Sequence, residues 1–153
     1  MKNLTKFVIG LAVGAFTMTG CSGLKKVSYE EFKEKALEAV ENAREPKTIV
    51  LKDGELEIAV SEDGTLKLNG ETISQEDESY IGAVLLVGII VGMDVATFAA
   101  TEMPDTEYYV GNGFKAVVTQ EEEKLTYQWN KDGWITKCTT STADDVVTVS
   151  YTF

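Results

Sequence analysis

The chain has 153 residues, of which 44% are hydrophobic and 25% charged, and its formal net charge is −11. These numbers are typical of one globular domain, and the negative charge argues against a nucleic-acid partner or electrostatic adhesion to anionic lipid. The sequence has no histidine, so it lacks both the commonest general base and the commonest metal ligand.

The first 21 residues have the layout of an export signal. Lys2 and Lys6 give a short positive start, and residues 7–18 form an uncharged, largely apolar run. A transmembrane helix needs about 20 apolar residues to cross the hydrocarbon core, so this run is too short to span it. The layout predicts a signal peptide over residues 1–20, which the mature protein loses.

Cys21 directly follows this run, after Met18, Thr19 and Gly20. The segment resembles the lipobox of bacterial lipoproteins, in which a large aliphatic residue and two small residues precede a cysteine; Met18 stands where leucine is usual. The resemblance implies cleavage between Gly20 and Cys21 and attachment of lipid to the Cys21 thiol, because a thiolate is the nucleophile that accepts the lipid. The exported protein is then held outside the cytoplasm by palmitate-like acyl chains, on the cell membrane or the outer membrane.

The mature chain is predicted to begin with a tether and to continue as one α+β domain. Residues 21–27 comprise the lipidated cysteine and a tether whose extended length is at most about 20 Å, and residues 28–153 form the domain. Its first element is a helix over residues 28–44. Ser28 and Glu31 form a capping box, and apolar side chains recur at helical spacing behind it.

A strand meander is predicted next. Asp53-Gly54 and Asn69-Gly70 are two-residue hairpin turns, and the residues between them alternate between apolar and polar. The predicted strands cover residues 48–52, 55–60, 65–68 and 71–73.

Residues 81–100 are the unusual part of the sequence. The first 13 of them, IGAVLLVGIIVGM, carry no charge, and Asp94 follows. Three structures are consistent with this composition: a buried core helix, a buried strand pair or a membrane-inserted segment. The length favours the core helix. Asp94 is expected near a helix end or between two shorter elements, and the Gly88 and Gly92 spacing is expected to allow close contact between helix and sheet.

The C-terminal third is predicted to return to strands. Apolar and polar residues alternate throughout it, which is typical of an antiparallel sheet with one packed face and one solvated face. The predicted strands cover residues 108–110, 114–120, 124–130, 134–140 and 146–153.

These elements predict an α+β fold, in which antiparallel meanders form a curved sheet packed on a central apolar helix, with a second helix at the N-terminus. This architecture loosely resembles the half-barrel lipid-carrier folds of bacterial envelopes, in which a curved antiparallel sheet wraps apolar helices. The resemblance is architectural and assigns no binding residue. Fold alone does not fix function, so the resemblance implies only that an apolar ligand could bind between the sheet and the helix.

No motif for phosphate binding, nucleophilic catalysis or metal ligation is recognised in the sequence, so we expect no enzyme, no cofactor and no metal site. With lipid on Cys21, Cys138 has no disulfide partner. Two hypotheses remain for the function of the membrane-anchored domain. In the first, it binds an apolar ligand or lipid between the sheet and the central helix. In the second, it is a surface-displayed interaction or structural module with a packed core and no ligand.

Under the first hypothesis, we expect the apolar ligand or core contacts to come from the central apolar segment. The residues chosen for this role are Val84, Leu85, Ile89 and Phe98. The sequence leaves open whether the partner is an apolar small molecule or a protein, and it leaves the oligomeric state open.

Overall fold

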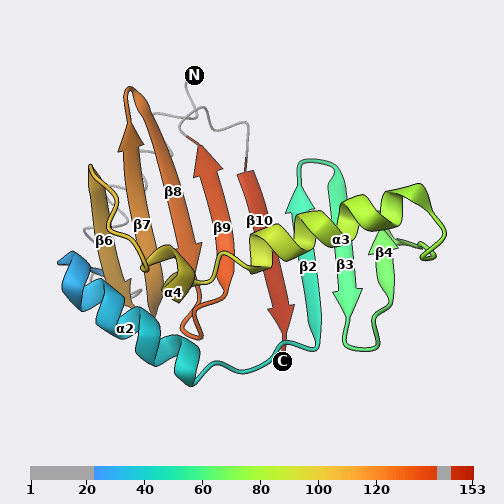
Figure 1. Ribbon diagram of the computed structural model, residues 1–153, viewed down its shortest axis with the longest axis horizontal. Coiled ribbons are helices and arrows are strands. Elements are labelled where there is room, and N and C mark those ends of the chain that lie inside the picture. Colours follow the sequence, from blue (N-terminus) through green and yellow to red (C-terminus); the bar gives the residue numbers. More distant parts are fainter. Residues whose placement is uncertain (1–22, 141–145) are drawn as a thin grey trace.

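The computed structural model describes residues 23–140 and 146–153. The predicted signal peptide, its cleavage site between Gly20 and Cys21 and the lipidation site at Cys21 lie outside the described residues. The described chain forms one ten-stranded sheet with helices on one of its faces (Figure 1). All its neighbouring strands are antiparallel. The expected α+β class with an antiparallel sheet is thereby confirmed.

The strands are β1 (Lys25–Val27), β2 (Thr48–Asp53), β3 (Leu56–Ser61), β4 (Leu66–Leu68), β5 (Glu71–Thr72), β6 (Thr106–Gly111), β7 (Gly113–Gln120), β8 (Glu123–Trp129), β9 (Ile135–Thr140) and β10 (Val146–Thr152). The helices of the described chain are α2 (Tyr29–Glu41), α3 (Glu78–Val91) and α4 (Val95–Phe98).

Two meanders make up the sheet, whose strand order is β1-β6-β7-β8-β9-β10-β2-β3-β4-β5. The meander β2–β5 and the meander β6–β10 join where β10 pairs with β2 and Val149 lies opposite Leu51. Both residues are buried, so the junction lies in the core and the two meanders form one continuous sheet.

The last three residues of the predicted tether belong to the sheet. Residues 25–27 form β1 and pair with β6, with Val27 opposite Tyr108. The physical reason is that, without β1, β6 would be the edge strand and its outer backbone donors and acceptors would be unpaired; a preceding extended segment can satisfy them. In the sequence, residues 22–24 lie between Cys21 and β1.

The larger part of the core lies beneath α2 and α4. Phe32 of α2 is completely buried, and its ring centroid lies 4.9 Å from that of Tyr108 and 5.8 Å from that of Phe114. The Trp129 indole N–H donates to the backbone oxygen of Met93 over 2.8 Å. Buried polar atoms of the aromatic residues are thus satisfied while their rings fill the core.

α2 begins where its sequence predicts. The Ser28 hydroxyl oxygen accepts a hydrogen bond from the backbone N–H of Glu31, which satisfies one of the unpaired donors of the first turn. The helix ends at Glu41, three residues before the predicted end at residue 44.

The segment 81–100 is helical but not continuous. α3 ends at Val91, and Asp94 then caps the short α4, accepting from the backbone N–H of Thr97 at 2.8 Å. Asp94 therefore lies at a helix end, as expected, and the strand-pair alternative is wrong for these residues. Within the described part of the chain, every helix is too short or too polar to cross a bilayer.

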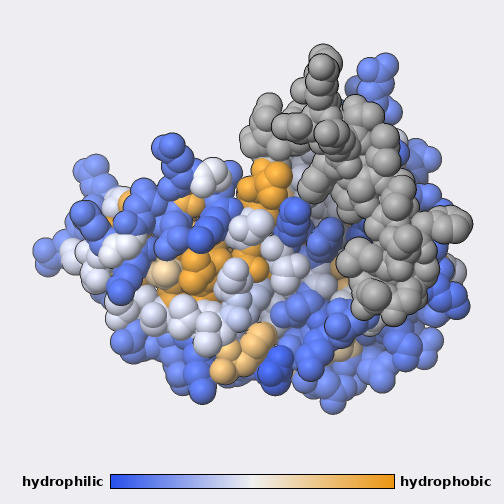
Figure 2. Space-filling model, turned by 180° about the vertical axis from the view of Figure 1, so that it is seen from behind, coloured by the Kyte–Doolittle hydropathy of each residue, from blue (hydrophilic) through white to orange (hydrophobic). Residues whose placement is uncertain are grey.

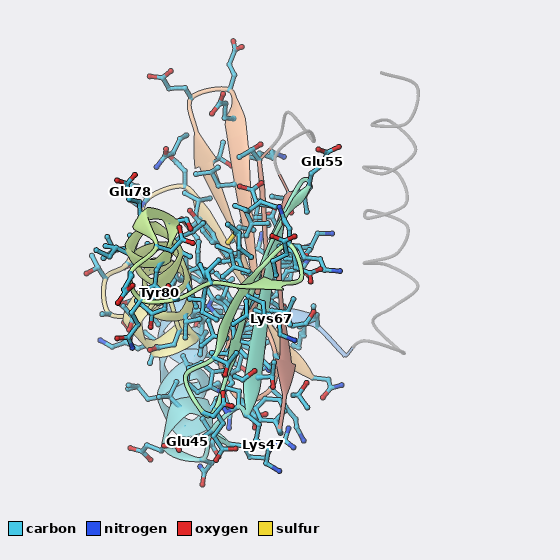
Figure 3. All side chains as sticks on the ribbon, turned by 90° about the vertical axis from the view of Figure 1, so that its right-hand side faces the viewer. Glu45, Lys47, Glu55, Lys67, Glu78 and Tyr80 are labelled. Carbon is cyan, nitrogen blue, oxygen red and sulfur yellow. The ribbon has the colours of Figure 1, made fainter. Side chains whose placement is uncertain are left out.

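All three described helices lie on one side of the sheet, which is plain when the molecule is viewed along the sheet (Figure 3). We call the opposite side the open face. The visible part of this face is largely hydrophilic around a small apolar centre (Figure 2). α3 crosses in front of β10, β2, β3 and β4 near one end of the sheet (Figure 1).

Candidate functional site

The inner side of α3 packs on the sheet. Ala83 and Val87 are buried against Ile58 of β3 and Leu66 of β4. Alternation along the strands points Ile58 and Leu66 to the helix side. This cluster attaches α3 to the meander β2–β5 and decides which side of the helix remains outside.

The outer side of α3 is apolar as well, although it faces solvent. The side chains of Ile81 and Ile89 are both 64% exposed, that of Leu85 is 60% exposed and that of Val84 is 43% exposed. Their spacings of three and four residues place them on one side of a helix. Contiguous apolar surface of this kind marks interaction sites on soluble proteins.

Two glycines lie among these side chains. A Cβ built on Gly88 would meet nothing within 4 Å, and one on Gly92 would meet backbone of its own helix only. The expectation that this pair allows close contact between helix and sheet is therefore wrong, because both residues are on the exposed side of α3. We define the outer face of α3 as Ile81, Val84, Leu85, Gly88, Ile89 and Gly92.

The four residues expected to make apolar ligand or core contacts lie in two different places in the structure. Val84, Leu85 and Ile89 belong to the outer face of α3 and point away from the sheet. Phe98 belongs to the aromatic core, where its ring centroid lies 4.8 Å from that of Trp129 and 5.2 Å from that of Tyr127. These side chains therefore do not line a common space between the sheet and α3.

That space is filled by other side chains. Leu86 of α3 and Ile49, Val60 and Leu68 of the sheet pack around the buried cluster of Ile58, Leu66, Ala83 and Val87. A hollow of about 200 Å³ does occur, but it lies between the end of α2 and the β8–β9 turn. It is lined by Val40, Ala43, Glu45, Asp94, Asp132, Gly133 and Trp134.

Two carboxylates of this hollow have structural partners. Asp94 caps α4 and also accepts from the Thr97 hydroxyl at 3.1 Å. Asp132 is buried and accepts from the Arg44 guanidinium at 2.9 Å, while Arg44 lies 4.1 Å over the Phe153 ring. Along the described chain, no group of three or more acidic or cysteine side chains is arranged to hold a metal ion.

Cys138 lies half-buried in β9 and is a free thiol. Burial raises its pKa to about 11, so the thiolate that nucleophilic or redox chemistry requires is scarce at neutral pH. The residue packs against the main core cluster, and this environment is that of a small hydrophobic side chain.

Comparisons with known proteins give no family assignment. The chain matches no protein-family model, no curated protein and no solved structure.

The outer face of α3 was not identified from the sequence. A helix that is apolar on every side carries no periodic signal to distinguish its packed side from its exposed side. One signal was available: Gly88 and Gly92 share a side with Leu85 at helical spacing, and small residues next to large apolar ones are typical of helix–helix contacts.

Proposed function

We propose that this chain is a membrane-anchored envelope lipoprotein without catalytic activity, whose domain is an interaction module that associates through the outer face of α3. Lipid on Cys21 would hold it at the membrane, and residues 22–24 would connect the lipid to β1. We favour this module over a carrier of apolar ligands, because side chains occupy the space between α3 and the sheet.

The observation that carries the proposal is the exposure of the outer face of α3. Four large apolar side chains project from one helix that has no charge between residues 79 and 93. Removing such a side chain from water is worth roughly 1.5–3 kcal/mol. A partner that covers this face therefore gains a large hydrophobic contribution without having to desolvate any charge.

The partner we propose is a second copy of the chain, paired through an antiparallel α3 helix. Gly88 and Gly92 leave room for close backbone approach, and a two-fold axis lets the same face serve both partners. The one charged residue of the helix is Glu78 at its start. Antiparallel pairing would keep the two Glu78 carboxylates about 20 Å apart, a helix length. Salt largely screens their repulsion at this separation.

The anchor is tested by metabolic labelling with an alkyne fatty acid. We expect label on the wild-type protein and none on Cys21→Ala, which should also leave the membrane fraction. Equal labelling of the two proteins would contradict the anchor.

Self-association is tested by sedimentation velocity on the purified protein. We expect a concentration-dependent dimer that Leu85→Glu abolishes, because a dimer would bury the new carboxylates in an apolar contact. Leu37→Glu is the matched control, since Leu37 is 49% exposed on α2 and lies outside the proposed contact. A wild-type monomer, or equal dimers in both variants, would contradict the proposal.

A further inference from the structure

The open face of the sheet carries four lysines in one line across the strands. Lys26 lies opposite Tyr109, which lies opposite Lys115, and the line continues through Gln128 to Lys137. From Lys137 it passes through Thr148 to Lys52. We call Lys26, Lys115, Lys137 and Lys52 the lysine row.

Side-chain contacts place these residues on one face. The Lys115 ammonium lies 5.0 Å from the Tyr109 ring centroid, and Lys26 pairs with Glu107, two residues from Tyr109. Residues opposite each other on neighbouring strands share a face, and the next residue of each strand points to the other face. Leu51 and Ala116, the neighbours of Lys52 and Lys115, are buried under the helices, so the row lies on the open face.

The row has a regular spacing. A lysine occurs on every second strand, and neighbouring strands lie about 4.8 Å apart, so successive lysines are attached about 10 Å apart. The strands between them contribute a tyrosine, an amide and a hydroxyl, namely Tyr109, Gln128 and Thr148. Cationic groups therefore alternate with an aromatic ring or with hydrogen-bonding groups along the sheet.

The strand residues of the open face carry more positive than negative charges, whereas the chain as a whole is negative. Lys67 and Lys124 lie on the same face, opposite Ala59 and Thr119. Among the described strand residues of this face, only Glu57 and Glu107 are acidic, whereas the net charge of the chain is −11. Strand alternation thus gathers cationic side chains on the open face of a chain whose net charge is negative.

We propose that the lysine row binds a linear acidic polysaccharide with one carboxylate in each disaccharide repeat. Such a polymer presents its charges at a spacing similar to that of the lysines, with a neutral sugar between them. The exposed salt bridges of Lys26 with Glu107 and of Lys52 with Glu57 are weak, so ligand carboxylates can replace them. Tyr109 offers a ring surface to a sugar, and Gln128 and Thr148 offer hydrogen bonds to its hydroxyls.

Two other anionic partners fit the row less well. Duplex DNA carries one charge per roughly 1.7 Å of its axis, far denser than the row, and the acidic remainder of the protein repels it. A lipid surface is flat, whereas the sheet is twisted, as the crossing of its strands shows (Figure 3). A flexible polymer can follow a row whose side chains turn with the twist.

Calorimetric titration of the purified protein with hyaluronan, which has one carboxylate per disaccharide, tests the proposal; neutral dextran and vesicles containing phosphatidylglycerol are the comparisons. We expect binding to hyaluronan that weakens as salt is raised. Lys115→Gln with Lys137→Gln should weaken it about tenfold or more. The paired variant Lys33→Gln with Lys35→Gln, which removes the same charge from α2, should bind like the wild type.

Two further variants separate charge from folding. Lys115→Arg with Lys137→Arg keeps the charges and should keep the binding, and Lys52→Gln alters a side chain that is 58% exposed and should weaken it without unfolding the sheet. The proposal is overturned if the wild type does not bind hyaluronan or if the row and α2 variants bind alike. Row-dependent binding to vesicles without binding to hyaluronan would assign the row to a membrane instead. None of these results depends on α3, so the outcome is separate from that of the self-association test.

Discussion

Gly133 shows how closely the β8–β9 turn approaches the helices. Its φ is 84°, a left-handed conformation that glycine adopts without strain. Its carbonyl oxygen accepts from the backbone N–H of Val95 at 3.0 Å. A Cβ on this residue would lie 2.8 Å from a methyl carbon of Val95 and 3.1 Å from one of Val40. The turn is therefore packed against both α2 and α4.

Gly133→Ala should lower the free energy of unfolding by about 2–4 kcal/mol, because the backbone strain and the clash with Val95 add together. Gly64→Ala is the matched control. Gly64 has a similar φ of 81°, but its Cβ would meet nothing within 4 Å, so we expect a loss of only about 1 kcal/mol. Urea denaturation followed by circular dichroism measures both. Equal losses would show that the contact with Val95 is unimportant.

Cys138 should react slowly with thiol reagents at pH 8. Its raised pKa of about 11 lies above this pH, and a raised pKa means less thiolate at any given pH. A Cys21→Ser variant leaves Cys138 as the only cysteine. We expect fast reaction of this variant in guanidinium chloride and at least about tenfold slower reaction in the native state, from the loss of thiolate. Equally fast reaction in both states would contradict the burial.

At the level of elements, α3 has two apolar sides with different roles. Val87 is buried against the sheet and Leu85 is 60% exposed. Val87→Ala should destabilise the protein by about 2 kcal/mol, because it removes buried methyl groups. Leu85→Ala should change the free energy of unfolding of the monomer by less than about 0.5 kcal/mol, as surface changes usually do. Urea denaturation at low protein concentration tests this, and a large loss in Leu85→Ala would contradict the assignment of sides.

Strands and turns were predictable because their signals are local. Asn69-Gly70 forms the turn that joins β4 to β5, and Gly54 begins the turn that joins β2 to β3; both glycines have a positive φ. The β2–β3 turn lies one residue later than predicted, because Asp53 belongs to β2 and pairs with Leu56. Alternation placed Leu56, Ile58 and Val60 on one face, and all three pack in the α3 cluster. Most element ends differ from the expected ones by one or two residues, which is the normal uncertainty of such boundaries.

β1 and the break between α3 and α4 were not predictable in the same way. β1 has three residues, and its partner β6 begins at Thr106, so only the folded sheet brings the two together. Residues 81–93 are apolar at every position, and such a run does not show where a helix ends. The Asp94 cap, with its hydrogen bond from Thr97, is a local signal that was masked by the apolar residues on both sides.

At the scale of the whole molecule, pairing between strands that are distant in the sequence determines the shape of the sheet and which side chains it aligns. The junction of β10 with β2 pairs Tyr151 with Ile49, residues from the two ends of the domain. This junction makes one long sheet, so α3 lies on its surface near one end (Figure 1). It also aligns lysines of strands that are distant in sequence, which is why the lysine row became visible only in the folded sheet.

The whole molecule therefore has two different surfaces, the apolar outer face of α3 and the cationic open face. Membrane attachment at Cys21 would restrict the chain to two dimensions and raise the chance that copies meet. The same restriction makes the native membrane the proper setting for a test of self-association.

The most direct test of the central claim is cysteine cross-linking of Leu85→Cys in membranes of the producing cells, with a mild oxidant. Because the outer faces of two α3 helices are proposed to pack together, we predict a covalent dimer that is lost on reduction. Leu37→Cys, which places an exposed thiol on α2, should remain monomeric. Monomeric Leu85→Cys, or equal cross-linking of the two variants, would contradict the claim.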